Sequence, residues 1–133
     1  MKKVLIVMCI VLCVMLGGTL AYADEVMPCY NEITEIQSTM TLDGNVLYYT
    51  VKVFTPAIDT LDSVHIDAQL KTVGGLTVAT YSENLNKIGP AFMFNKNKTL
   101  TRTGTYFLDY TVTCYKNGNV VDEVSKTTVT ATY

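Results

Sequence analysis

Apolar and polar residues alternate without a break along residues 63–71 of the segment 63–73, and this feature constrains the fold more than any other in the chain. In an extended strand successive side chains point to opposite faces. One face of this segment would carry Val64, Ile66, Ala68 and Leu70, and the other His65, Asp67, Gln69 and Lys71. A helix would spread the apolar residues around its axis, so the pattern predicts a β-strand with one buried face.

Similar alternation recurs along the chain, and no long segment shows a helical repeat of apolar residues. The expected strands are residues 33–42, 46–55, 63–73, 76–82, 91–101, 106–114 and 120–133. Turn residues lie between them, including Gly74-Gly75, Gly89-Pro90 and Asn117-Gly118, and Asn-Gly is the strongest short hairpin signal. Nineteen threonines between residues 34 and 132 are typical of a β-rich chain.

About seven strands at this spacing, separated by turns, predict an all-β fold: an antiparallel immunoglobulin-like β-sandwich. Its core should be formed by the apolar faces of the alternating strands. The residues expected to be buried are Leu47, Tyr49, Val51, Val64, Ile66, Leu70, Tyr106, Leu108 and Val112.

The first 23 residues have the pattern of a secretory signal peptide. Lys2 and Lys3 precede an apolar run from residue 4 to 16, and Ala21-Tyr22-Ala23 supplies the small residues of a cleavage site. We expect cleavage after Ala23, which leaves one domain of residues 24–133. The alternative is an uncleaved anchor, for which the apolar run is short of the roughly 20 residues that span a bilayer.

Removal of the leader changes the charge of the chain. Lys2 and Lys3 are its only charged residues, so the formal net charge moves from −2 to −4. An acidic domain is not expected to bind nucleic acid. We therefore expect a secreted domain that is not embedded in a membrane.

Four cysteines become two when the leader is removed, because Cys9 and Cys13 lie within it. In an exported protein the remaining pair, Cys29 and Cys114, predicts a disulfide. The strand face of Cys114 offers no histidine or basic residue that would activate a thiol. The bond would close a loop of about 85 residues and stabilise the fold by about 3 to 5 kcal/mol. Two buried thiols are the alternative.

The spacing of Leu100, Gly104 and Tyr106 resembles the tyrosine corner of immunoglobulin-like sandwiches. In that motif a tyrosine near the start of a late strand donates a hydrogen bond to the backbone just upstream. The chain departs from the pattern because it has no tryptophan, and Cys114 lies eight residues after Tyr106. Cys114 is therefore not expected to be the inter-sheet cysteine of antibody domains.

Several segments together resemble a family of small secreted β-sandwich proteins of clostridia and related Gram-positive bacteria. They are the leader, the proline and tyrosine of MPCYNEI, the segment GTYFLDYTVTCYKNGNVV and the ending TATY. The resemblance implies the same fold and export from the cell. It implies no catalytic residue, cofactor or ligand.

Catalytic chemistry has few candidates in this sequence. His65 is the only histidine, and no nucleophile motif accompanies it, so we expect a solvent-facing side chain. A carboxylate-dependent hydrolase and a calcium-dependent surface protein are alternatives, because calcium prefers oxygen ligands. Both would draw on the oxygen-rich group Asp59, Thr60, Asp62, Ser63 and Asp67.

A basic segment, residues 87–102, suggests a ligand surface. Its cations, which are interleaved with Phe92, Met93 and Phe94, are Lys87, Lys96, Lys98 and Arg102. Such a surface could bind an anionic polymer of the cell wall, such as a teichoic acid. In the alternative interpretation the phenylalanines face the core and the lysines keep an edge strand from pairing. We expect a non-catalytic binding domain without a cofactor, whose partner is a cell-wall polymer or another surface protein.

The first testable prediction concerns the leader. Protein exported through its own N-terminal segment should begin at Asp24, as measured by intact mass and N-terminal sequencing. Replacing Ala23 with phenylalanine should block this cleavage, because the site needs small residues. Exported protein that keeps Met1 and sediments with membranes would instead show an uncleaved anchor.

Overall fold

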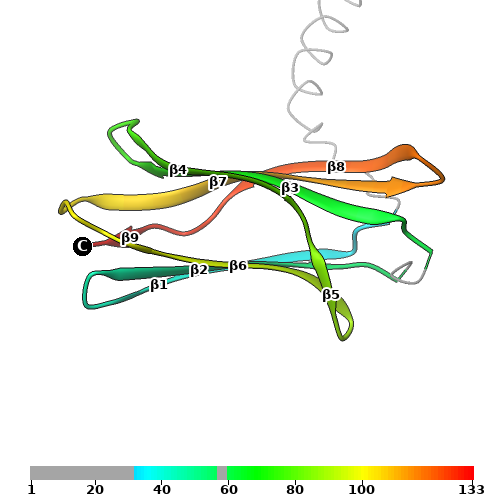
Figure 1. The fold of residues 1–133 in the computed structure, drawn as a ribbon, viewed down its shortest axis with the longest axis horizontal. Helices are drawn as coiled ribbons and strands as arrows, with labels where there is room; N and C mark the ends of the chain where they lie inside the picture. Colours follow the sequence, from blue (N-terminus) through cyan, green and yellow to red (C-terminus); the bar gives the residue numbers. More distant parts are fainter. Residues whose placement is uncertain (1–31, 57–59) are drawn as a thin grey trace, which may run out of the picture.

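A computed structural model describes residues 32–56 and 60–133 of the 133-residue chain. These residues form two antiparallel sheets that face one another (Figure 1). The strands are β1 (Glu35–Asp43), β2 (Val46–Phe54), β3 (Ser63–Thr72), β4 (Thr77–Asn84), β5 (Asn86–Ile88), β6 (Ala91–Thr99), β7 (Thr105–Lys116), β8 (Asn119–Thr127) and β9 (Ala131–Thr132).

One sheet has the order β1-β2-β6-β5, and the other has the order β4-β3-β7-β8, with β9 also paired to β7. These orders correspond to the ABED and GFCC′ sheets of immunoglobulin domains. The predicted fold class is therefore confirmed: the protein is an all-β antiparallel sandwich of immunoglobulin type.

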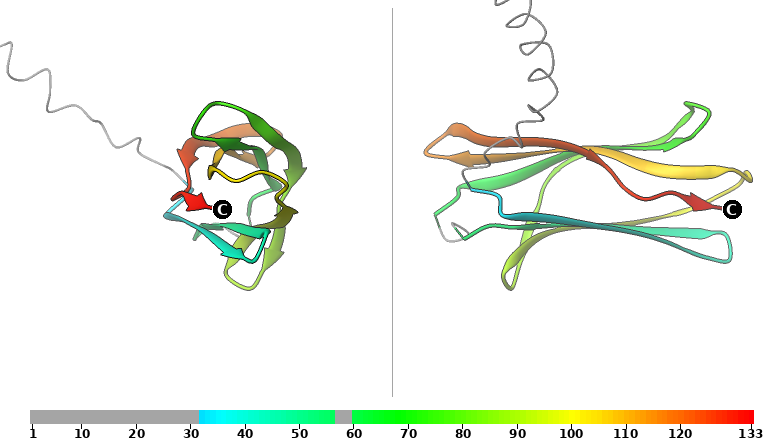
Figure 2. Two further views of the ribbon diagram at one scale, coloured as in Figure 1. Left: turned by 90° about the vertical axis from the view of Figure 1, so that its left-hand side faces the viewer. Right: turned by 180° about the vertical axis from the view of Figure 1, so that it is seen from behind.

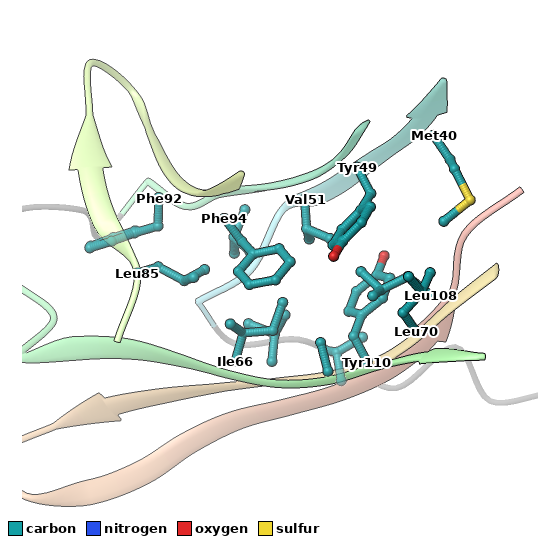
Figure 3. Packing of buried hydrophobic residues seen from close by; sticks show 14 of the residues in the cluster. Met40, Tyr49, Val51, Ile66, Leu70, Leu85, Phe92, Phe94, Leu108 and Tyr110 are labelled. Carbon is teal, nitrogen blue, oxygen red and sulfur yellow. The ribbon is translucent and has the colours of Figure 1, made fainter. Parts of the chain in front are cut away.

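The core lies between the two sheets, where the apolar faces of the strands meet (Figure 3). All nine residues predicted to be buried are buried, and eight of them have no exposed surface. The polar partners on β3 stay at the surface, so the predicted register of that strand is also confirmed. Alternation was sufficient to find the core because the period of a strand is two.

An aromatic cluster joins the sheets near their middle. The rings of Tyr49 on β2 and Phe94 on β6 pack against Tyr81 on β4, with centroids 6.0 and 5.5 Å from the Tyr81 ring. The hydroxyls of Tyr49 and Tyr81 also share a hydrogen bond between the sheets. Burial and this hydrogen bond raise the pKa of Tyr49, so the hydroxyl stays protonated.

Two strands differ from the sequence expectation. The segment predicted as one strand, residues 120–133, is divided into β8 and β9. Thr127 pairs with Asp109 but Ala131 pairs with Tyr106, so the C-terminal segment carries one extra residue. The side chain of Thr128 accepts the Leu108 N–H there, which replaces a regular ladder bond.

The short strand β5 was not predicted, because its three residues are all exposed and show no alternation. Leu85, directly before it, packs in the core where the chain passes from one sheet to the other (Figure 3). The Asn117-Gly118 turn is as expected. Both residues have positive φ, 52° and 74°, as in a type I′ hairpin turn.

The tyrosine corner is confirmed at the end of the sandwich that holds the β1–β2 and β3–β4 turns (left in Figure 1). Tyr106 Oη donates a hydrogen bond to the carbonyl oxygen of Arg102 at 2.6 Å. In the same region Val73 N donates to Thr105 O at 2.9 Å, and Gly104 and Tyr133 exchange two backbone hydrogen bonds. These contacts hold the β6–β7 loop, residues 100–104, and the start of β7 against the β3–β4 turn and the C-terminal residue Tyr133.

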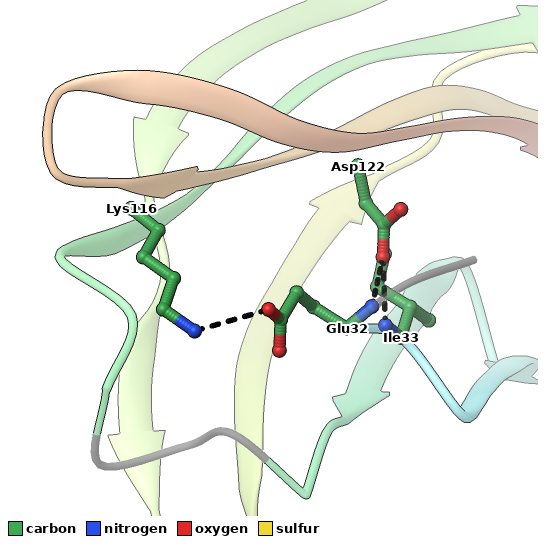
Figure 4. A network of polar contacts seen from close by, with 4 residues as sticks. All are labelled: Glu32, Ile33, Lys116 and Asp122. Atoms are coloured by element: carbon green, nitrogen blue, oxygen red, sulfur yellow. Dashed lines mark hydrogen bonds and ion pairs between the residues drawn. The ribbon is translucent and has the colours of Figure 1, made fainter.

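At the opposite end of the sandwich, the buried Asp122 carboxylate binds the backbone of the segment that precedes β1 (Figure 4). Asp122 Oδ2 accepts the backbone N–H groups of Glu32 and Ile33 at 2.6 and 2.8 Å. The Glu32 carboxylate also pairs with Lys116 Nζ at 3.1 Å. Hydrogen bonds to a charged group are stronger than neutral ones, so Asp122 anchors this segment to β8.

Cys114 lies beside this anchor, with its side chain fully buried opposite Asp122 in the β7–β8 pairing. As a thiol, its pKa is raised to about 12, mainly by burial and further by the Asp122 and Glu32 carboxylates. A thiolate is therefore disfavoured, which argues against a catalytic role. Cys29 lies outside the described residues, so the disulfide stays a prediction. Glu32 follows Cys29 by three residues and contacts the same end of β7.

The tyrosine corner can be tested with Tyr106→Phe. The variant leaves the Arg102 carbonyl without its donor, and we expect a loss of about 1 to 2 kcal/mol in the free energy of unfolding. Denaturant unfolding measures this change. Tyr48→Phe is the control, because Tyr48 is 42% exposed. Equal stabilities of the two variants would show that the corner contributes nothing.

The cysteine pair can be tested by titrating thiols in the exported protein, denatured but not reduced. We expect no reactive thiol if Cys29 and Cys114 are bonded; two thiols would contradict the disulfide. After reduction, Cys114 in the folded protein should react very slowly with iodoacetamide at pH 8. That pH lies far below a pKa of about 12, so the thiolate fraction is small.

Candidate functional site

A groove of about 790 Å³ opens at the end of the sandwich stabilised by the tyrosine corner. One wall is the β3–β4 turn region, residues 72–78, and the other is the continuous run of residues 98–106 from the end of β6 to the start of β7. We call it the end groove. Its volume falls within the range of small-molecule sites, roughly 300 to 1,000 Å³.

The charge of the end groove is wholly positive. Lys98 and Arg102 are the charged residues that line it, and both are exposed. Neither forms an ion pair with another residue of the described ranges. No aspartate, glutamate or histidine belongs to its described lining. The groove therefore presents two cations to a ligand and, within its described lining, no carboxylate or imidazole.

Hydroxyl groups and a small apolar rim complete the groove. Thr99, Thr101 and Thr103 are exposed along the second wall. On the first wall Val73 and Leu76 are 65% and 52% exposed. The groove thus offers cations and hydroxyls on one wall and apolar surface on the other.

The walls are fixed by hydrogen bonds before any ligand arrives. The Arg102 carbonyl is held by Tyr106, and Leu100 N donates to Asn45 O at 2.7 Å. Leu76 N donates to Thr72 Oγ1 at 3.1 Å, and Thr72 N donates to Leu76 O at 2.9 Å. A site whose backbone is already ordered loses little entropy on binding.

The four cations predicted from the sequence do not form one surface. Lys98 and Arg102 line the end groove, whereas Lys96 Nζ pairs with Glu83 at 2.8 Å and lies 5.8 Å from the centre of the Phe94 ring. Lys87 is on β5, outside the groove lining.

The aromatic residues of the same segment are not available to a ligand. Phe92 and Phe94 are buried in the core, as the alternative interpretation of this segment expected. Beyond Met93, β6 pairs with β2 on one side and has no β5 residue on the other. Lys96 and Lys98 therefore lie on an edge segment, where lysines oppose pairing with other strands.

A second polar group lies on the outer face of the β4-β3-β7-β8 sheet. His65 Nδ1 is 2.9 Å from Asn84 Oδ1, and Nε2 is 3.0 Å from Ser82 Oγ. Asp67 Oδ1 lies 3.5 Å from Nε2. Leu85 N donates to Val64 O, so 65/84 and 67/82 are non-hydrogen-bonded pairs, in which side chains approach most closely. We call these four residues the sheet-face cluster.

The sheet-face cluster has a serine, a histidine and an orienting amide in order, as a nucleophilic centre needs. Its location does not suit catalysis, because the side chains lie on the exposed face of a sheet. Asp67 is 61% exposed and competes with Ser82 for the same ring nitrogen. An adjoining hollow of about 270 Å³ includes Asp67 and Asp109, but Asp109 is paired with Lys71 at 2.7 Å. A cross-strand polar ladder explains these contacts.

The residues proposed for calcium are spread apart where they are described. Asp62 Oδ2 accepts the Gly118 N–H at 2.9 Å, at the β7–β8 turn, while Asp67 belongs to the sheet-face cluster. Within residues 32–56 and 60–133 no three acidic, histidine or cysteine side chains gather as a metal site would require. Asp59 lies outside the described residues.

No helix in the described part of the chain has the length and apolar character needed to cross a membrane.

The end groove was not predicted as a site, because it joins two segments about 25 residues apart in the sequence. A local signal was present in the run TLTRTGT, residues 99–105, where hydroxyl residues surround one arginine. The expectation of a basic ligand surface included Lys98 and Arg102 but could not separate them from Lys87 and Lys96. That separation depends on the Lys96–Glu83 ion pair between the two sheets and on the position of Lys87 on β5.

No family model matches the chain, and no match is found among curated proteins. Among solved structures, the chain is similar to a crystal structure of a candidate beta-galactosidase from Bacteroides fragilis, with 19% identity and a TM-score of 0.37. The match covers 69% of this chain and 15% of that one, so this chain spans a small part of the other protein. A similarity of this degree transfers neither activity nor substrate.

Proposed function

We propose that the protein is an exported, non-catalytic binding domain and that the end groove is its contact surface. One observation supports this most strongly: the groove is lined by two cations and several hydroxyls, with no carboxylate or histidine among its described residues. Such a lining can hold an anionic ligand, and it lacks the histidine and carboxylate side chains that most often serve as acid–base pairs.

The distribution of titratable groups favours binding over hydrolysis. The sheet-face cluster contains the histidine, Ser82 and the Asp67 carboxylate, and none of them belongs to the groove lining. A hydrolase would need these groups to converge in a concave site that excludes water. The carboxylate-dependent hydrolase is therefore the weaker proposal.

Glu32 and the groove lie at opposite ends of the sandwich. Glu32 pairs with Lys116 at the end that holds the β7–β8 turn. The β3–β4 turn, whose residues form one wall of the groove, lies at the other end (Figure 2). Export is inferred from the leader, so the partner is proposed to be a component of the cell surface: a wall polymer or another surface protein.

The proposal can be tested by filling the groove. Thr103→Trp places a large side chain in the groove, and Thr80→Trp makes the same change in the hollow on the sheet face. Saturable binding of the exported protein to isolated cell envelopes should weaken roughly tenfold or more for Thr103→Trp, a loss of about 1.4 kcal/mol. Binding by Thr80→Trp should be unchanged.

The opposite pattern of the two variants would move the contact surface to the sheet face and contradict the proposal. Saturable binding that neither variant changes would also contradict it. Turnover of an envelope polymer that is lost in His65→Ala would show an enzyme instead. Melting temperatures of both variants should be measured first, since both threonines are exposed and their replacement should leave the fold intact.

A further inference from the structure

We propose that the end groove binds an anionic, hydroxyl-rich chain: a polyol or glycan polymer that carries phosphate or carboxylate groups. This inference rests on the proposed function, because it names the ligand class of the same groove. It follows from four features of the lining: its charge, its hydroxyls, its lack of an exposed aromatic ring, and the adjoining strand edge.

The positive charge of the groove favours an anionic ligand. Lys98 and Arg102 have no ion-pair partner among the described residues, although the chain as a whole is acidic, with a net charge of −2. A guanidinium binds an oxyanion through two parallel hydrogen bonds, and an ammonium binds it as a point charge. Arg102 follows Lys98 by four positions, so the two lie at most about 14 Å apart at the backbone. Two anionic groups of one polymer could therefore be bound together.

The hydroxyls of the groove suit a ligand that bears hydroxyls of its own. Thr99, Thr101 and Thr103 alternate with Leu100 and Arg102, so the hydroxyls recur at every second residue beside the cations. Leu100 is buried, whereas the three threonines are exposed. A threonine hydroxyl both donates and accepts a hydrogen bond, which matches the repeating hydroxyls of a polyol or sugar.

A neutral sugar is a poor fit for the same site. Tyr106 is the one aromatic residue in the described lining, and it is 3% exposed with its hydroxyl bonded to the Arg102 carbonyl. Within the described lining, no ring is thus available to pack against an uncharged sugar face. The cations must supply much of the affinity, so binding should weaken as salt screens them.

An acidic peptide added as an extra strand is the competing occupant. The β6 edge beyond Met93 is open on the β5 side, next to the groove. However, Lys98 lies on the groove side of that edge segment, and lysine at such a position opposes strand addition. The position of Lys98 therefore favours a polymer that is bound through its charged groups and hydroxyls over a peptide that is bound through backbone hydrogen bonds.

The test uses defined polymers of matched length and isothermal titration calorimetry with the exported protein. Oligomeric glycerol phosphate and oligogalacturonate carry phosphate and carboxylate groups respectively, and they distinguish the two sources of charge. A neutral maltooligosaccharide and poly-L-glutamate test the competing classes. We expect saturable binding to at least one anionic hydroxyl-rich polymer, weakened in 0.5 M NaCl, and no binding to the neutral polymer.

Variants assign the binding to the groove. Arg102→Ala should weaken binding roughly tenfold or more, and Arg102→Lys should restore part of the loss because it keeps the charge. The carbonyl that holds Tyr106 belongs to the backbone, so the tyrosine corner should survive both changes. Lys126→Ala, an exposed lysine on β8, is the control and should bind as the parent does.

Tighter binding to poly-L-glutamate than to both anionic hydroxyl-rich polymers would overturn the inference in favour of a peptide. Equal binding to the neutral polymer, or no effect of Arg102→Ala, would overturn it as well. If none of the polymers binds while Thr103→Trp still abolishes binding to envelopes, the ligand class is wrong and the proposed function stands. If Thr103→Trp has no effect on envelope binding, the proposed function itself fails.

Discussion

The hydrogen bond from the Tyr106 hydroxyl to the Arg102 carbonyl determines the shape of the end groove. It closes the loop between β6 and β7 onto the start of β7, and the backbone bond from Val73 to Thr105 brings the β3–β4 turn to the same place. Arg102 is therefore displayed on a fixed backbone although its side chain is exposed. A rigid support of this kind is what a binding site requires, because little order has to be created when the ligand arrives.

The sandwich architecture also explains why the cations of the end groove lie apart from the histidine and serine of the sheet-face cluster. Both sheets bury one face, so the histidine, carboxylate and lysine side chains are left to the outer faces and the two ends. On the outer face His65, Ser82 and Asn84 meet because neighbouring strands bring non-hydrogen-bonded pairs close together. Their order resembles a nucleophilic centre, yet an open sheet face provides no enclosure. Geometry among three side chains is thus insufficient evidence of catalysis without a cleft around them.

Strand periodicity made the core predictable, since the alternating residues of β2, β3 and β7 face one interior. The tyrosine corner was also predictable, because its spacing is local. Features that depend on contacts between distant segments were not. The break between β8 and β9 arises where Thr128 bonds to Leu108, and the groove arises where residues 72–78 meet residues 98–106. The separation of Lys96 from Lys98 depends on Glu83, which belongs to the other sheet.

The location of ligand contact can be measured directly by nuclear magnetic resonance, following amide chemical shifts while an anionic oligosaccharide is added. If the end groove is the binding surface, the shifted amides should fall in residues 72–78 and 98–106 and should saturate together. Amides of β3 and β4 around His65 and Ser82 should stay unchanged. Saturable shifts centred on those sheet-face residues, with the groove unaffected, would contradict the assignment of the end groove as the site of recognition.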